Sequence, residues 1–209
     1  MDRNKIVVVL GMHRSGTSAA MRGLEVLGVE LGDNLYPPAV DNPKGFWEDR
    51  DILDINRELL AHLGSGTECL GLFDWQLPDT PAIASLSRKA ETLLRDKCDD
   101  TPLWGFKDPR TARLLPFWQP IFASIDRDAY YVIVIRNPVS VVESLRKRNG
   151  IAPEKTFYLW LEHLVPALAR TGGARRVVVD YDRLLEDPQL QLSRDRKSTR
   201  LNSSHIPIS

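Results

Sequence analysis

The chain has 209 residues with 28 basic and 28 acidic side chains, and its formal charge of zero gives no support to nucleic-acid binding. With 43% hydrophobic residues, it is long enough for one sizeable α/β core and too short for two full domains. No apolar run approaches the length of a membrane span, and the first residues lack a signal-peptide pattern. The sequence therefore predicts a cytoplasmic protein without a transmembrane segment.

The first predicted element is a buried strand that is followed at once by a tight loop and a helix. Ile6–Leu10 is a β-branched, almost uninterrupted apolar run, which is typical of a parallel strand covered on both faces. Gly11 and Gly16 bracket the loop, and a helix is expected to begin at Thr17 or Ser18. Such a loop directs several backbone N–H groups and a helix N-terminus toward one point, so we expect it to bind phosphate or sulfate.

Strands and helices continue to alternate along the rest of the chain. This alternation favours βαβ units and one parallel sheet. Further strands are expected at Leu103–Phe106, Tyr130–Ile135 and Val177–Val179, and helices within Gly45–Leu63, Pro81–Lys97, Thr111–Ser124, Pro138–Asn149, Phe157–Arg170 and Arg183–Leu185.

The loop lacks the lysine of nucleotide-hydrolysing P-loops. In the pattern G-x-x-x-x-G-K-[ST] a lysine directly follows the second glycine, and here that position is Thr17. Arg14 and the hydroxyls of Ser15, Thr17 and Ser18 remain as donors. A P-loop small-molecule kinase that depends on Mg²⁺ stays open as an alternative, but it would lack the residue that reaches the outer phosphates.

Two later strands also end in ionisable side chains. Lys107–Arg110 follows one strand, and Arg136–Pro138 follows another. Ligands of an open parallel sheet bind at the carboxyl ends of its strands. These two clusters and the glycine-bracketed loop are therefore expected to converge on one site.

Two motifs resemble those of sulfotransferases that use 3′-phosphoadenosine 5′-phosphosulfate (PAPS). His13–Ser18, HRSGTS, resembles the loop that binds the 5′-phosphosulfate, in which a basic residue precedes S-G-T-[ST]. Arg136–Pro138, with Ser144 eight residues after the arginine, resembles the 3′-phosphate motif of the same family. The loop resembles that of the bacterial and tyrosylprotein-like branch of the family, which carries an arginine instead of a lysine at this position. The resemblance implies an α/β three-layer sandwich with a central parallel sheet, the P-loop NTPase-like sulfotransferase fold.

The resemblance also implies an activity and the residues that carry it. The family transfers a sulfuryl group from PAPS to an acceptor hydroxyl or amine, in line and without a metal. Its binding residues correspond here to Arg14, Ser15, Gly16, Thr17 and Ser18 for the phosphosulfate and to Arg136 and Ser144 for the 3′-phosphate. Lys107, in the K-D-P stretch, corresponds to a basic residue near the sulfuryl group, where Arg14 is also expected to act.

Transfer also requires a base that takes the proton of the acceptor. Glu48 is the candidate, because it follows a Pro/Gly-rich loop at the start of a helix expected to flank the cleft, and acidic residues of this region have that role in similar enzymes. A carboxylate in the first helical turn, favoured by the helix dipole, explains Glu48 equally well. Asp49, Asp51 and His13 stay open as alternative bases.

The acceptor is not determined by the sequence. The loops expected to line its pocket do not distinguish a small molecule, a glycan or a lipid, and they leave the oligomeric state open. A non-catalytic nucleotide-binding module is a further alternative to the enzyme.

The end of the chain matches the translation of an artificial DNA sequence. Asp195–His205, DRKSTRLNSSH, is the in-frame translation of a common sequencing-adapter sequence. We therefore expect residues 195–209 to be a disordered read-through, and residues 1–194 to be a sulfotransferase-like domain that is incomplete at its C-terminus.

Overall fold

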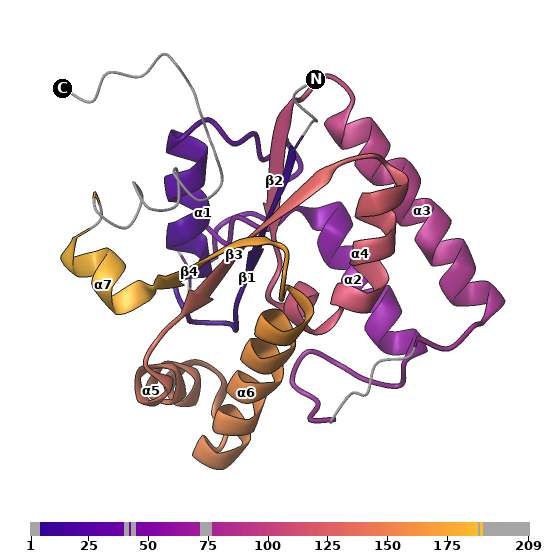
Figure 1. Ribbon diagram of the computed structural model, residues 1–209. Helices are drawn as coiled ribbons and strands as arrows, with labels where there is room; N and C mark the ends of the chain where they lie inside the picture. Colours follow the sequence, from indigo (N-terminus) through magenta and orange to yellow (C-terminus); the bar gives the residue numbers. More distant parts are fainter. Residues whose placement is uncertain (1–4, 40–41, 43–44, 72–76, 188, 190–209) are drawn as a thin grey trace.

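A four-stranded parallel sheet forms the centre of the molecule. The computed structural model describes residues 5–39, 42, 45–71, 77–187 and 189, so the predicted tail lies outside the described residues. The strand order is β2-β1-β3-β4, and all three pairings are parallel (Figure 1). The strands are β1 (Lys5–Leu10), β2 (Leu103–Lys107), β3 (Asp128–Ile135) and β4 (Arg175–Asp180). The predicted α/β class with a central parallel sheet is confirmed.

The helices follow the predicted order, and the larger differences are three. The helix expected at Thr111–Ser124 is divided into a 3₁₀ turn and a separate α-helix, α6 begins at Pro153 rather than Phe157, and α7 spans Tyr181–Glu186 rather than Arg183–Leu185. Proline suits the first turn of a helix because its missing N–H is not needed there. The helices are α1 (Thr17–Val26), α2 (Arg50–His62), α3 (Pro81–Cys98), η1 (Pro109–Arg113), α4 (Leu115–Ser124), α5 (Pro138–Asn149), α6 (Pro153–Arg170) and α7 (Tyr181–Glu186).

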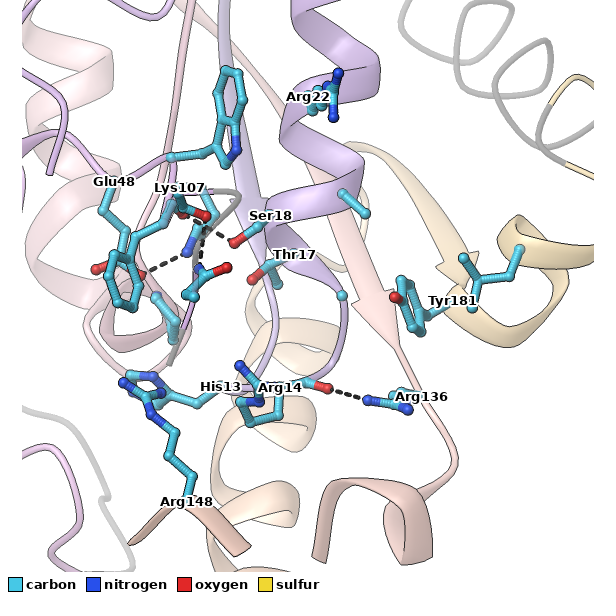
Figure 2. Close-up of a pocket in the computed structure, with 18 residues that line it drawn as sticks. His13, Arg14, Thr17, Ser18, Arg22, Glu48, Lys107, Arg136, Arg148 and Tyr181 are labelled. Atoms are coloured by element: carbon cyan, nitrogen blue, oxygen red, sulfur yellow. Dashed lines mark hydrogen bonds and ion pairs between the residues drawn. The ribbon is translucent and has the colours of Figure 1, made fainter. Parts of the chain in front are cut away.

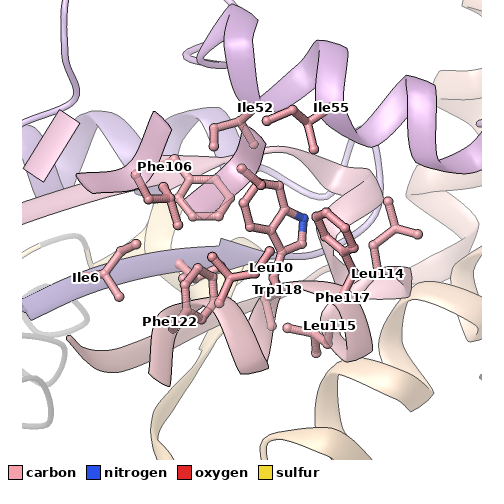
Figure 3. Close-up of a cluster of buried hydrophobic side chains, with 14 of the residues drawn as sticks. Ile6, Leu10, Ile52, Ile55, Phe106, Leu114, Leu115, Phe117, Trp118 and Phe122 are labelled. Atoms are coloured by element: carbon pink, nitrogen blue, oxygen red, sulfur yellow. The ribbon is translucent and has the colours of Figure 1, made fainter. Parts of the chain in front are cut away.

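Strand β1 lies at the centre of three layers. Its alternate side chains Ile6 and Leu10 pack against α2 and α4, where Trp118 and Phe122 fill the space (Figure 3). Val7, on the opposite face, packs with α1 and α7. All the described side chains from Ile6 to Leu10 are fully buried, and each contributes roughly 1.5–3 kcal/mol by leaving water. This explains why the strand reads as an uninterrupted apolar run.

The parallel arrangement brings three loops to one edge of the sheet. Val9 of β1 pairs with Lys107 at the end of β2, and Leu10 pairs with Ile133 near the end of β3. The segments after β1, β2 and β3 therefore leave the sheet side by side. In the described part of the chain, none of the helices has both the length and the apolar content needed to cross a membrane.

Candidate active site

A cleft of about 340 Å³ opens at this edge of the sheet, beside the N-terminus of α1 (Figure 2). The charge of its described lining is strongly positive, with five cationic side chains and one carboxylate: Arg14, Arg22, Lys107, Arg136 and Arg148 against Glu48. A cleft lined by one sign of charge concentrates ligands of the opposite sign. The cleft therefore suits an anionic ligand.

The loop between β1 and α1 has a tightly turned backbone that other groups can approach closely. Gly16 is the N-cap of α1 with φ 89°, and a Cβ placed there would lie 1.9 Å from Cδ2 of Tyr181. Arg14 also has a left-handed backbone, with φ 67°. No side chain caps α1, so its first N–H groups and the positive end of its dipole are directed to the cleft. The predicted turn that ends at Gly16 and leads into a helix at Thr17 is confirmed, and binding of an anion there stays a prediction.

Arg14, predicted for the phosphosulfate, is hydrogen-bonded to both of the residues predicted for the 3′-phosphate. Arg136 Nη1 donates to the main-chain oxygen of Arg14 at 2.9 Å, and Arg14 Nε donates to Ser144 Oγ at 2.8 Å. Arg14 and Arg136 line the cleft, whereas Ser144 lies behind Arg14 on α5. The segments that follow β1 and β3 are therefore connected directly at the cleft.

The hydroxyl groups of the loop have different surroundings. Thr17 and Ser18 line the cleft, and Ser18 Oγ donates to the main-chain oxygen of Phe46 at 3.0 Å. Ser15 is fully buried, and its Oγ meets no hydrogen-bond partner within the described chain. Arg136 Nε is likewise buried without a hydrogen bond in the described part, with Asp182 Oδ1 at 3.9 Å. Buried polar groups are normally paired, so Arg136 Nε, which belongs to a residue that lines the cleft, fits a site completed by a ligand, whereas Ser15 does not line the cleft.

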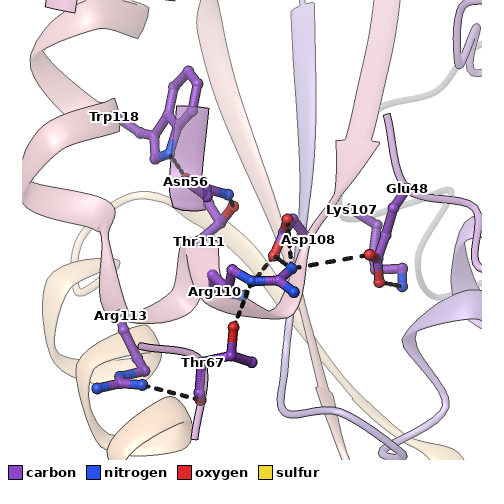
Figure 4. Close-up of polar contacts among 9 residues, drawn as sticks. All are labelled: Glu48, Asn56, Thr67, Lys107, Asp108, Arg110, Thr111, Arg113 and Trp118. Atoms are coloured by element: carbon purple, nitrogen blue, oxygen red, sulfur yellow. Dashed lines mark hydrogen bonds and ion pairs between the residues drawn. The ribbon is translucent and has the colours of Figure 1, made fainter. Parts of the chain in front are cut away.

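Glu48 and Lys107 form a buried ion pair on the opposite side of the cleft. Lys107 Nζ lies 2.6 Å from Glu48 Oε1, and their side chains are 3% and 8% exposed. Arg110, which is paired with Asp108 at 2.9 Å, places its Nη1 4.0 Å from Glu48 Oε2 (Figure 4). Glu48 precedes Asp49, the N-cap of α2, so the interpretation of Glu48 as a first-turn carboxylate is wrong.

The two alternative aspartates are engaged elsewhere. Asp49 accepts hydrogen bonds from the backbone N–H groups of Asp51 and Ile52, and both carboxylates pair with Lys97 Nζ at 2.8 Å. Neither aspartate lines the cleft. Their contacts stabilise the start of α2 against the end of α3.

His13 lines the cleft and is the other candidate base that does so. Its Nε2 has no hydrogen-bond partner among the described residues. Burial, followed by the positive charge of Arg110, holds the pKa of His13 well below its usual value. The imidazole is therefore neutral at neutral pH, and its surroundings disfavour the protonated form, which makes it a weak base.

Tyr181 and Arg148 are among the residues that line the cleft without having been predicted from the sequence. Tyr181 packs on Gly16, and its ring centroid lies 5.1 Å from the guanidinium carbon of Arg136. Arg148 extends from the end of α5 toward His13 (Figure 2). Its position one helical turn after Ser144, on the same face of the helix, is the signal that could have indicated it.

Comparison with known proteins identifies the fold. No protein-family model matches the sequence, and none of the curated proteins is significantly similar to it. The sulfotransferase domain of the Synechococcus PCC 7002 olefin synthase aligns over 94% of this chain and 73% of its own length, at 18% identity and a TM-score of 0.55. A sulfotransferase domain from the curacin biosynthetic pathway aligns over 98% and 75%, at 17% identity and a TM-score of 0.56. The chain therefore has the α/β fold that these sulfotransferase domains share.

Proposed function

We propose that this chain transfers a sulfuryl group from PAPS to an acceptor hydroxyl. The observation that carries the proposal is the contact of Arg14 with both Arg136 and Ser144, because it joins the loop predicted to bind the phosphosulfate to the residues predicted to bind the 3′-phosphate. A donor with phosphate groups at both its 3′ and 5′ ends requires two such anion sites. The fold shared with sulfotransferase domains and the positive lining of the cleft support the same conclusion.

The binding roles follow from the positions of the donors. The N-terminus of α1 and the loop residues Arg14 to Ser18 would hold the 5′-phosphosulfate. Arg136 would hold the 3′-phosphate, because a guanidinium is always charged and binds phosphate through two parallel hydrogen bonds. Ser144 would be a second donor there. The arginine in the loop supports the bacterial and tyrosylprotein-like branch.

The chemical roles rest on the Glu48–Lys107 pair. PAPS, when bound, would supply an activated sulfuryl group. Glu48 would take the proton of the acceptor hydroxyl. The hydroxyl oxygen would bond to sulfur while the bond between sulfur and the phosphate oxygen of PAPS breaks. Lys107 and Arg14 would stabilise the negative charge that develops on the departing phosphate oxygen. Lys107 also fixes the Glu48 carboxylate in one position, through their 2.6 Å contact.

A transfer experiment tests this proposal against the kinase alternative. The chain is incubated in EDTA with sulfur-35-labelled PAPS and a panel of sugars, phenols and alkyl alcohols, and in parallel with phosphorus-32-labelled ATP and Mg²⁺. Labelled product from PAPS in EDTA is expected. Label transferred only from ATP, and only with Mg²⁺, would favour the kinase, in which Thr17 would have to replace the missing lysine.

A further inference from the structure

A second cavity, of about 220 Å³, adjoins the cleft. The two share His13 and Arg148, which lie together at one end of the cleft in Figure 2. Side chains of α5, of α6 and of the segment before residue 72, which comprises residues 64–71 after α2, line the second cavity. Because a single water needs only about 10–15 Å³, the space accommodates a group of many atoms.

The wall formed by the segment before residue 72 is fastened to the core. Arg113, which is almost completely buried, donates hydrogen bonds to the main-chain oxygens of Gly66, Thr67 and Cys69 at 3.3, 3.4 and 3.0 Å (Figure 4). Arg113 also lies 3.5 Å from Glu162 of α6. The cavity is therefore formed before any ligand enters.

His163 presents an unused hydrogen-bond acceptor in this cavity. The side chain is 1% exposed, and its Nδ1 lies 2.7 Å from the main-chain oxygen of Leu159, one turn earlier in α6. Because a carbonyl oxygen can only accept, Nδ1 carries the proton and Nε2 carries the lone pair. Nε2 has no partner among the described residues. Burial lowers the pKa of His163 to about 3, so the ring is neutral and the lone pair remains available.

The remaining lining does not suit a fully charged ligand. Arg110 donates to both oxygens of Asp108, at 2.9 and 3.0 Å, and to Thr67 Oγ1 at 2.9 Å. An anion would meet the carboxylate of Glu68, and a cation would meet the arginines. Leu145, Ile151 and Leu159 provide an apolar wall opposite these polar groups. Uncharged rings with hydroxyls at their edges and carbon on their faces match such a lining.

We propose that this second cavity binds the acceptor, an uncharged polyol or sugar ring, and that His163 Nε2 accepts a hydrogen bond from one of its hydroxyls. The inference rests on the proposed function, because it takes the adjoining cleft as the PAPS site. His13, at the boundary of the two spaces, would then lie beside the hydroxyl that enters the cleft. His163 holds the acceptor ring and does not itself exchange protons with the transferred group.

The test observes His163 directly, without requiring transfer. The protein with nitrogen-15-labelled histidine is saturated with 3′,5′-ADP and titrated with myo-inositol or methyl α-glucopyranoside, and separately with 4-nitrophenol or 1-hexanol. A saturable upfield shift of the His163 Nε2 resonance is expected with the polyols, because the lone pair accepts a hydrogen bond. The proposal is overturned if the polyols leave this resonance unchanged, or if it responds only to the phenol or the alkyl alcohol.

Two substitutions provide a matched comparison and assign the resonance. In His163→Asn the amide replaces Nδ1 and leaves the Nε2 position empty, whereas in His163→Gln an amide oxygen reaches the Nε2 position. Loss of one neutral hydrogen bond is expected to weaken polyol binding about 3- to 10-fold in His163→Asn, and His163→Gln is expected to restore most of the affinity. Equal affinity for the polyol in His163→Asn and the unsubstituted protein would overturn the role of His163.

Binding of 3′,5′-ADP distinguishes a failure of the proposed function from a failure of the proposed acceptor site. Its affinity is expected to be the same in both variants and in the unsubstituted protein. If the unsubstituted protein does not bind 3′,5′-ADP, the proposed function fails. If 3′,5′-ADP binds normally and the polyols do not reach His163, the acceptor site alone is wrong.

Discussion

Arg136 Nη1 donates a hydrogen bond to the main-chain oxygen of Arg14, at a distance of 2.9 Å. The contact joins the end of β3 to the loop that follows β1, although 122 positions separate the two residues in the sequence. Arg14 holds its left-handed backbone at the point where this hydrogen bond is made. A change at either arginine is therefore expected to affect the shape of the loop as well as its charge.

Arg14→Ala is expected to reduce sulfuryl transfer more than it reduces cofactor binding. The loss of a cation that stabilises developing charge lowers the turnover rate by about 10²–10³-fold, whereas the backbone N–H groups of the loop remain. Turnover on a defined acceptor and calorimetric titration with 3′,5′-ADP measure the two effects. Arg183→Ala, which removes a largely exposed arginine outside the cleft, is the control. Equal losses in turnover and in affinity would argue against a role for Arg14 in the transfer step.

Glu48→Gln is expected to lower turnover by about 10²–10⁴-fold, with little change in the affinity for 3′,5′-ADP, because it removes the proposed base. The substitution also leaves Lys107 without its buried counter-ion, so a thermal unfolding curve is needed to show that the variant is folded. Asp51→Asn, which changes a carboxylate outside the cleft, is the control. Full turnover in Glu48→Gln would transfer the role of base to His13, and His13→Asn would then be the slow variant.

Gly16→Ala is expected to destabilise the fold and to abolish binding of 3′,5′-ADP. The new Cβ would meet the ring of Tyr181 at 1.9 Å, and the backbone has φ 89°. Gly28→Ala is a matched control, because Gly28 has a similar φ of 91° with nothing within 4 Å of the added Cβ. The control should lose about 1 kcal/mol from backbone strain, and Gly16→Ala should lose clearly more. Equal shifts in melting temperature would show that the contact with Tyr181 is unimportant.

The free energy of unfolding is expected to fall as the pH is lowered from about 6.5 toward 3. The pKa of His163 is about 3 in the folded protein and 6.5 in its unperturbed form, so the unfolded chain binds the extra proton in this range. His13 acts in the same direction, since its pKa is also lowered. At pH 5 the lowered pKa of His163 reduces the free energy of unfolding by roughly 2 kcal/mol. Urea unfolding at pH 7.5, 6 and 5 measures it, and His163→Asn should make the pH dependence shallower. An equally steep dependence of the free energy of unfolding on pH in His163→Asn would contradict the lowered pKa of His163.

The sequence predicted the parts of the fold that depend on local pattern. The apolar run Ile6–Leu10 indicated a doubly covered strand, and Gly11 and Gly16 indicated the loop that follows it. Alternation of such runs with helical periodicity then gave the parallel sheet. The apolar periodicity of α6 begins only at Phe157, whereas the helix begins at Pro153, because proline suits the first turn of a helix without any apolar pattern.

The contacts within the cleft could not be predicted in the same way. The hydrogen bond between Arg14 and Ser144 joins residues 130 positions apart, and no local pattern specifies it. His163 reads as one more residue on an amphipathic helix, because only the packing of α6 shows that its ring faces a cavity. Of the residues indicated by the sulfotransferase-like motifs, Arg14, Thr17, Ser18 and Arg136 line the cleft, and Ser15 and Ser144 do not. The second cavity depends on how α5 and α6 pack together.

The most direct test of the proposed PAPS site is calorimetric titration with 3′,5′-ADP and separately with 5′-AMP, both in EDTA, for the unsubstituted protein and for Arg136→Ala. The two ligands differ only by the phosphate that Arg136 is proposed to bind. We predict a clear preference for 3′,5′-ADP, and a loss of about 10- to 100-fold in its affinity in Arg136→Ala, with a smaller effect on 5′-AMP. Equal affinity of the unsubstituted protein for both ligands, or binding only after Mg²⁺ is added, would contradict the proposed PAPS site.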